Sequence, residues 1–313
     1  MATTNSITTT YAGEFQGKYI STALFSGVTI ANDGIEVKSN IKYKEVIKKL
    51  VSGTLLADST CDFSPSSSLT QTERYLTPKE IQVNLEICKT DYQSDWDAIS
   101  MGMSSHDSLP KSFADFLLAH VVEKVAEEIE VSIWQGDGST GEFDGFVKLA
   151  EADGTVIPAT GTAAAVNAAN VIDEMRKATD LVPDRIYGSE SLRMFVSNNV
   201  ARAYVQSLGG FGANGLGANG IEGKGTTWRT DGTLSFDGIQ IFVAQGLPSN
   251  TMFVAEKDNL WFGCGLTSDQ NEVKVLDMAD IDGSKNVRII MRMTGCVNYG
   301  IGSEIVYYKA GVA

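Results

Sequence analysis

The feature that most constrains the fold is a long amphipathic segment near the middle of the chain, from Ser112 to Gln135. Ser112 and Asp115 form a capping-box-like pair, and Gly136 ends the segment. Apolar residues recur every four positions, the spacing of one helix face: Phe113, Leu117, Val121, Val125, Ile129 and Ile133. The segment predicts one continuous helix of about 35 Å, longer than the usual three turns.

A β-sheet is the expected partner of this helix. Ile81 to Cys88 alternates apolar and polar residues, as does Val287 to Thr294, and this period of two is typical of half-buried strands. We therefore expect both segments to lie in one sheet, with the apolar stripe of the helix packed on it. The acidic residues of the helix are expected on its solvated side; they are Glu123, Glu127, Glu128 and Glu130.

A polar excursion lies between the N-terminal part of the chain and this sheet. Its tip, Ser59 to Thr72, holds Pro65 and a run of three serines, and its flanks Gly53 to Ala57 and Arg74 to Leu85 are strand-like. The region from Asn40 to Lys79 therefore predicts an extended hairpin that projects from the body. The basic cluster of the chain lies beside it: Lys38, Lys42, Lys44, Lys48 and Lys49.

The other segments predict an α+β fold with mixed or antiparallel sheets. Helices are expected at Tyr11 to Leu24, Ser94 to Met101, Val166 to Thr179 and Ser189 to Ala203, and a strand at Arg185 to Tyr187. Gly209 to Gly225 is glycine-dense and predicts a loosely ordered surface loop. From residue 233 onward strands are expected at Ile239 to Val243, Thr251 to Ala255, Leu260 to Gly263, Glu272 to Leu276 and Glu304 to Lys309.

Composition narrows the function. The chain has 39 acidic and 25 basic side chains in 313 residues and a net charge of −14, which argues against a general nucleic-acid binder. No apolar run of about 18 residues indicates a membrane span, and the start of the chain does not resemble a secretory signal. Four widely spaced cysteines are expected to be reduced thiols, as in a protein made in a reducing cytoplasm.

The sequence motifs do not assemble an active site. Three G-x-G-x-x-G matches lie after the long helix or in the glycine-rich loop, without the strand and helix that a dinucleotide site needs. His106 and His120 have no acid and nucleophile arranged as a catalytic triad requires. We therefore expect no catalytic residues, no cofactor and no metal, and a protein that is not an enzyme.

The order of elements resembles the major capsid proteins of tailed bacteriophages, the Hong Kong 97-type fold. Four stretches carry the resemblance: Thr72 to Trp96, Ser112 to Gly138, Ala169 to Val196 and Asp237 to Gly265. They are similar to the strand returning from the extended loop of that family, to its spine helix, and to the helix–strand–helix and the end of its axial domain. The resemblance divides the chain into an N-terminal arm and helix (1–39), an extended loop (40–80), a peripheral domain with the spine helix (81–165), an axial domain (166–271) and peripheral return strands (272–313).

The resemblance implies a subunit of an icosahedral shell, built from hexamers and pentamers around packaged DNA, in the virion of a phage assembled in the host bacterial cytoplasm. Partners would be further copies of the chain, DNA bound without sequence-specific contact, and separate scaffolding, portal and decoration proteins, with no membrane. The expected subunit contacts come from the excursion: Lys42, Lys44, Lys48, Lys49, Glu73 and Arg74. An encapsulin-type compartment and a soluble α+β enzyme with an unrecognised site remain alternatives.

Overall fold

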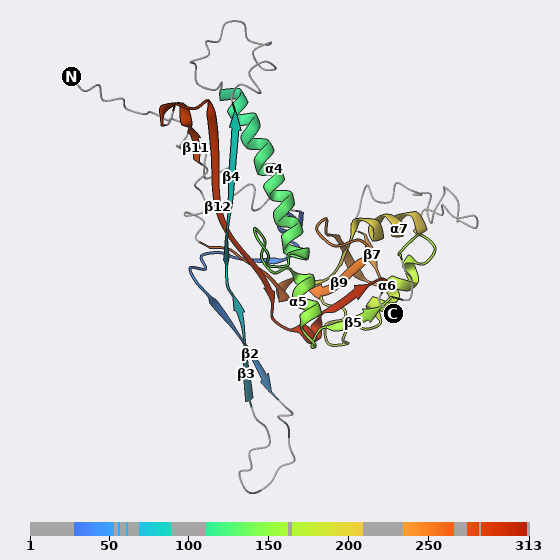
Figure 1. Ribbon diagram of the computed structural model, residues 1–313. Helices are drawn as coiled ribbons and strands as arrows, with labels where there is room; N and C mark the ends of the chain where they lie inside the picture. Colours follow the sequence, from blue (N-terminus) through green and yellow to red (C-terminus); the bar gives the residue numbers. More distant parts are fainter. Residues whose placement is uncertain are drawn as a thin grey trace, which may run out of the picture.

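A computed structural model describes residues 28–52, 56, 61, 69–88, 111–161, 165–208, 234–265, 274–281 and 283–311. The expected helices at Tyr11 to Leu24 and Ser94 to Met101 lie outside these residues, as does the glycine-dense segment Gly209 to Gly225. The described part of the chain forms two mixed sheets and a separate two-stranded hairpin (Figure 1).

The first sheet is built around one long strand, β12. Antiparallel pairing joins its first part to β4 and β11 and its last part to β10, and β1 adds to β10 in parallel. The strands are β1 (Glu36–Lys38), β4 (Lys79–Cys88), β10 (Leu260–Gly263), β11 (Lys274–Asp277) and β12 (Asn286–Tyr299). The predicted pairing of the two alternating segments is confirmed, with Leu85 opposite Ile289 and Val83 opposite Met291.

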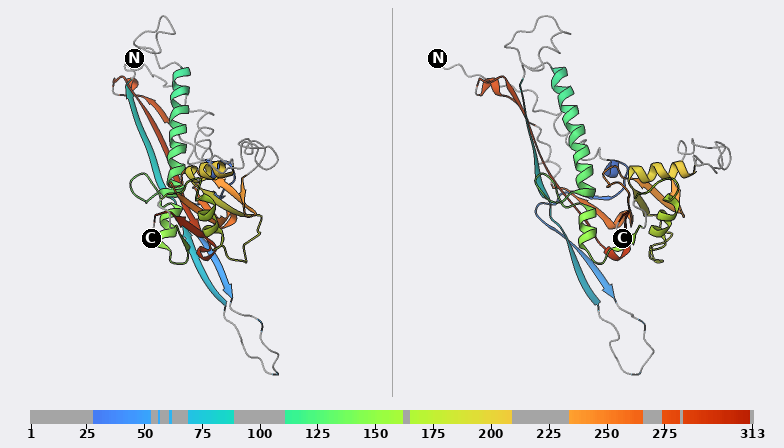
Figure 2. Two further views of the ribbon diagram at one scale, coloured as in Figure 1. Left: turned by 90° about the vertical axis from the view of Figure 1, so that its right-hand side faces the viewer. Right: turned by 45° about the vertical axis from the view of Figure 1, so that its right-hand side comes forward.

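The long helix is α4 (Lys111–Gln135), and it runs alongside β4 and β12 (Figures 1 and 2). Its stripe from Val121 to Ile133 is buried in one core with Ile289, Met291 and Met293 of β12. The helix and its sheet partner are therefore confirmed for this stretch. Burying each such side chain contributes about 1.5–3 kcal/mol, so this contact is a main anchor of the fold.

One expectation about this helix is wrong. Glu123, Glu127 and Glu128 are exposed, but Glu130 is buried with 4% of its surface accessible. Its carboxylate accepts hydrogen bonds from the backbone N–H of Thr29, at 3.0 Å, and from the Thr29 hydroxyl. Trp134 Nε1 donates to the same hydroxyl at 2.9 Å. The helix face that carries Glu130 is covered by the short helix α2 (Val28–Ala31), which its own spacing could not reveal.

The second sheet has the order β5-β13-β9-β6-β8-β7, with α6 and α7 packed beside it (Figure 1). Its strands are β5 (Ile157–Thr160), β6 (Leu192–Val196), β7 (Ser235–Phe236), β8 (Ile239–Val243), β9 (Thr251–Glu256) and β13 (Val306–Lys309). The helices are α6 (Val171–Thr179) and α7 (Asn198–Leu208). The late strands lie close to their predicted positions.

The predicted order of elements before α7 is wrong. Residues 185–187 form turns rather than a strand, and the range predicted as one helix, Ser189 to Ala203, holds the strand β6 followed by the start of α7. β6 is a central strand between β8 and β9, and Met194, Phe195 and Val196 are all buried. A short continuous apolar run of this kind is shared by buried strands and buried helices, so periodicity could not separate them.

Short helical elements lie between the strands of the two sheets. α5 (Phe146–Ala152) follows the loop after α4, and the 3-10 helices η4 (Lys257–Asn259), η6 (Met278–Asp280) and η7 (Gly302–Glu304) lie in the connections of the late strands. Trp134, at the end of α4, packs against Phe146 of α5 and against Phe195 and Phe253 of the second sheet, with ring centroids 5.2–5.8 Å apart. One aromatic cluster therefore links α4 to both α5 and the second sheet.

Candidate functional site: the projecting hairpin

The hairpin consists of β2 (Glu45–Ser52) and β3 (Leu69–Leu76), which pair only with each other among the described strands. It projects away from the two sheets in every view (Figures 1 and 2). The predicted excursion is therefore present. β2 lies earlier than the expected flank Gly53 to Ala57, most of which is outside the described residues, and the other expected flank is divided between β3 and β4 at Pro78.

One face of the hairpin is open and partly apolar. Side chains alternate between the two faces of a strand, and the register places Val46 opposite Tyr75, Lys48 opposite Glu73 and Leu50 opposite Gln71 on the same face. The exposed fractions are 42% for Val46, 63% for Leu50 and 44% for Tyr75. Large apolar side chains exposed together in this way are typical of a surface that binds another protein. We call Val46, Lys48, Leu50, Glu73 and Tyr75 the outer face.

Charged contacts fix the side chains along the outer face. Lys48 Nζ lies 3.9 Å from Glu73 Oε1, and the Tyr75 hydroxyl donates to Glu73 Oε2 at 3.1 Å. Lys44 Nζ lies 3.5 Å from the centroid of the Tyr75 ring. The hydrogen bond to the Glu73 carboxylate raises the pKa of Tyr75, so the phenol stays neutral and remains a donor. These exposed contacts are worth about 0–1 kcal/mol each, enough to order side chains but not to hold a fold together.

The predicted contact residues divide into groups. Lys44, Lys48 and Glu73 lie together along the outer face, and Lys42 is exposed in the segment before β2. Lys49 alternates with Lys48 and is half-buried on the opposite face. Arg74, also on the opposite face, turns toward the body of the molecule. The structure therefore brings three of the six residues into one surface and gives Arg74 a contact within its own chain.

Arg74 anchors the base of the hairpin. Its guanidinium forms an ion pair with Asp153, the residue that ends α5, and lies 4.9 Å from the ring centroid of Tyr299 at the end of β12. The Tyr299 hydroxyl donates to Asp153 Oδ2 at 2.9 Å. Thr155 donates to the other carboxylate oxygen through its backbone N–H at 2.9 Å and its hydroxyl at 2.7 Å. The Asp153 carboxylate thus accepts hydrogen bonds at both of its oxygens.

The pKa shifts of this group have clear causes. Burial disfavours the charge on Asp153, but the hydrogen bonds from Arg74, Thr155 and Tyr299 outweigh burial and hold its pKa well below the usual range. Burial, together with the neighbouring Asp153 carboxylate, raises the pKa of Tyr299. The ion pair therefore stays charged across the physiological pH range.

Lys79, the first residue of β4, provides a second anchor. Its Nζ donates to three backbone carbonyls of the loop that follows α4, those of Gly138 at 2.8 Å, Ser139 at 2.5 Å and Glu142 at 2.7 Å. Gly138 adopts φ +74°, in the left-handed region that favours glycine, so the loop can turn its carbonyls toward the ammonium. The roles of Lys79, Asp153 and Tyr299 cannot be predicted from the sequence, because no local pattern marks partners that are far apart along the chain.

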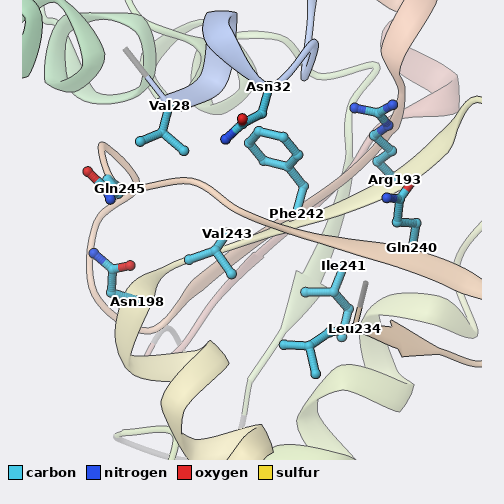
Figure 3. Close-up of a pocket in the computed structure, with 10 residues that line it drawn as sticks. All are labelled: Val28, Asn32, Arg193, Asn198, Leu234, Gln240, Ile241, Phe242, Val243 and Gln245. Carbon is cyan, nitrogen blue, oxygen red and sulfur yellow. The ribbon is translucent and has the colours of Figure 1, made fainter. Parts of the chain in front are cut away.

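A pocket of about 460 Å³ lies at the second sheet, beside α2 and the start of α7 (Figure 3). Its lining combines apolar groups with Arg193 and four side-chain amides; the residues are Val28, Asn32, Arg193, Asn198, Leu234, Gln240, Ile241, Phe242, Val243 and Gln245. None of these ten residues has a carboxylate, imidazole, thiol or hydroxyl group. The lining therefore offers no general base or nucleophile for catalysis.

The described residues contain no group of three or more His, Cys, Asp or Glu side chains placed to hold a metal ion. Among the helices that the structure describes, none has the length and apolarity needed to cross a bilayer. The hairpin is thus the feature of the described chain that most needs a functional explanation.

Comparisons with known proteins address the fold. No protein-family model and no curated protein matches this sequence. Solved structures do match. A chain of "Capsid of native GTA particle computed with C5 symmetry" superposes with a TM-score of 0.60 at 13% identity, over 93% of this chain and 91% of that one. "The capsid of Myoviridae Phage XM1" gives 0.57 at 12% identity, over 91% and 92%.

The chain has the Hong Kong 97-type capsid fold. The α+β class and the capsid resemblance inferred from the sequence are thereby confirmed at the level of the fold. A third solved structure, "Crystal structure of virus-like particle from Pyrococcus furiosus", matches with a TM-score of 0.52 at 8% identity, over 96% of this chain and 99% of that chain.

Proposed function

We propose that this chain is the major capsid protein of a tailed bacteriophage, and that its copies assemble as hexamers and pentamers into an icosahedral shell around the DNA genome. The observation that carries the proposal is the match over more than nine-tenths of the chain to subunits of a phage capsid and of the GTA particle capsid. The proposed role is structural rather than catalytic, in keeping with the capsid structures that the chain matches.

The outer face of the hairpin supplies the proposed contact with a neighbouring copy. An isolated two-stranded hairpin is marginal in water, and exposed Val46, Leu50 and Tyr75 gain burial only against another surface. The lysines proposed as contacts are Lys42, Lys44 and Lys48, together with Lys49 on the opposite face of the hairpin, and in a chain of net charge −14 they favour an acidic patch on the neighbour. Glu73 orders this surface from within the hairpin, and Arg74 supports it from below.

The remaining partners follow from the same proposal. A chain of net charge −14 would repel packaged DNA and let it slide past the inner wall without sequence-specific contacts. Scaffolding, portal and decoration proteins would be separate chains, and assembly would take place in the host cytoplasm before the chain becomes part of the virion capsid. The division into arm, extended loop, peripheral and axial domains belongs to this proposal.

A compartment shell of the encapsulin type is the second candidate, because the chain also matches a subunit of a virus-like particle, with a lower TM-score of 0.52. The two candidates differ in what the particle holds. Shells purified from the native source would contain packaged DNA in the first case and an enzyme cargo in the second. Nuclease-resistant nucleic acid inside the particles would therefore favour the capsid, and a protein cargo would favour the compartment.

Size-exclusion chromatography with negative-stain microscopy tests assembly itself. The full chain is expressed alone and together with the genes that flank it in its own genome. We expect elution in the megadalton range and closed, even-sized shells. A chain that remains a monomer or small oligomer under both conditions would contradict the proposal.

A further inference from the structure

The junction between the hairpin and the body is short and tightly bound on both sides. Only Thr77 and Pro78 separate β3 from β4. Leu76, the last residue of β3, is fully buried in a small core with Ile41, Trp261 and Cys296. Leu76 and Ile41 hold the two sides of the hairpin at its base, but a small apolar core does not by itself fix the direction in which the strands leave it.

Two cations lie on either side of this buried leucine and bind different parts of the body. Arg74 reaches Asp153 and Tyr299, at the ends of α5 and β12. Lys79 reaches the carbonyls of Gly138, Ser139 and Glu142. The Asn298 side chain adds a hydrogen bond to the backbone carbonyl of Tyr75 at 2.7 Å. The stretch from β3 to the start of β4 is therefore attached to the body at Arg74, Tyr75 and Lys79, in addition to the buried Leu76.

We propose that Arg74 and Lys79 are positioning residues that fix the direction in which the hairpin leaves the body. The small core around Leu76 and Ile41 holds the base, and the two cations restrict bending of the hairpin about this core. The hairpin thus behaves as a rigid extension of the sheet in a single chain, before any neighbour binds. For assembly, which rests on the proposed function, this means that the outer face is presented already oriented, and less entropy is lost when a contact forms.

The character of the two anchors explains why they suit this task. The side chains of Arg74 and Asp153 are 35% and 16% exposed, so their ion pair is shielded from solvent more than a surface pair. A planar guanidinium lying on an aromatic ring while it pairs with a carboxylate has restricted orientation, which an ammonium in the same place would not have. Lys79 instead binds through three convergent carbonyls, a contact that depends on the shape of the loop after α4.

The test is a distance measurement between two spin labels on the full-length chain. One label is placed at Leu50→Cys on the hairpin and the other at Glu128→Cys on the exposed face of α4. Cys61→Ser and Cys88→Ser remove the more accessible thiols, while Cys264 and Cys296 are 2% and 6% exposed and stay unlabelled. Labelled chain is diluted in unlabelled chain, so that the distance measured lies within one subunit.

We expect one narrow distance distribution for this parent. Arg74→Met, Lys79→Met and the isosteric Asp153→Asn should each broaden it roughly twofold, because one restraint on the direction is lost. Arg74→Lys should restore part of the sharpness, since it keeps the ion pair with Asp153. Arg288→Met is the matched control, because it removes an exposed ion pair with Glu86 in the first sheet, away from the base of the hairpin.

A broad distribution in the parent would overturn the inference. An unchanged width in Arg74→Met and Lys79→Met, or equal broadening in the Arg288→Met control, would also overturn it. If Arg74→Met does not fold, Asp153→Asn and Arg74→Lys provide the same comparison. The distance is measured within a single chain and does not depend on assembly. If the parent gives a narrow distribution but forms no shells, the proposed function is contradicted while this inference still holds.

Discussion

Two antiparallel ladders in this molecule have similar local structure and opposite surroundings. In the ladder of β4 and β12, Ile289, Met291 and Met293 are at most 3% exposed, because α4 covers that face. In the ladder of β2 and β3, Val46 and Leu50 are 42% and 63% exposed, and no segment that the structure describes covers the outer face. Strand pairing is thus not what distinguishes the two regions. The first ladder is completed within one chain, and the second is suited to be completed by another.

The largest effect is expected where the first ladder meets its helix. Val125→Asp would bury an unpaired carboxylate among the residues that join α4 to the sheet, and Val125 is 5% exposed. We expect a loss of several kcal/mol in the free energy of unfolding, enough to unfold a marginally stable domain. Glu127→Gln, on the exposed side of the same helix, should change it by less than about 0.5 kcal/mol. Equal losses in urea unfolding would contradict the packing described for α4.

A smaller loss is expected at the place where the two ladders meet. Leu76→Ala removes the fully buried side chain at the base of the hairpin and should cost about 2–4 kcal/mol. Leu50→Ala removes the same atoms on the outer face and should change the free energy of unfolding by less than about 0.5 kcal/mol. Thermal unfolding of both variants separates these values. Similar losses would mean that the outer face is already buried within one chain.

Acid titration sharpens the comparison at the anchor. The pKa of Asp153 is lowered in the folded chain, so its contribution to stability is fully present above its unfolded pKa of about 3.9 and is lost as the pH falls through the folded value. Between pH 5 and 8 the contribution should be constant. In that range Asp153→Asn should lower the free energy of unfolding by about 1–3 kcal/mol. The difference in stability between the variant and the parent should disappear only below about pH 4. A difference that disappears instead near neutral pH would contradict this account of Asp153.

The smallest stability effects, with the largest effects on assembly, are expected on the outer face. Val46→Ser and Leu50→Ser together should leave the unfolding midpoint nearly unchanged, since both side chains are exposed in the single chain. The same double variant should reduce the yield of closed shells, because the contact with a neighbour loses apolar area. The yield is measured by sedimentation of assembled particles. A normal yield of closed shells would show that the outer face is not part of the contact between subunits.

Several parts of the fold can be predicted from the sequence, because a long regular spacing of apolar residues fits only one kind of secondary structure. The stripe of α4 and the alternation in β4 and β12 are of this kind, and Leu260 to Gly263 forms a strand with the predicted bounds. The sequence predicts a helix where β6 forms, because a short buried strand carries no period of its own. The sequence predicts Glu130 on the solvated side of the helix, but the side chain is buried. The covering residue, Thr29, comes from a segment about a hundred positions earlier.

The candidate site could be predicted only in outline. The polar tip and the lysines indicated a projecting hairpin, and Lys48 with Glu73 became neighbours through strand pairing. The base of the hairpin depends on Arg74 meeting Asp153 and Tyr299, and on Lys79 meeting a loop some sixty positions later. Contacts between distant segments are set by the packing of whole elements, which no local pattern in a single sequence records.

A cryo-electron microscopy map of the assembled particle is the most direct test of the central claim that the second ladder is completed by another copy. We expect the outer face, with Val46, Leu50 and Tyr75, to lie against a neighbouring subunit, with the Arg74–Asp153 ion pair kept inside each chain. Closed shells in which this face lies in solvent or folds back on its own subunit would contradict the account.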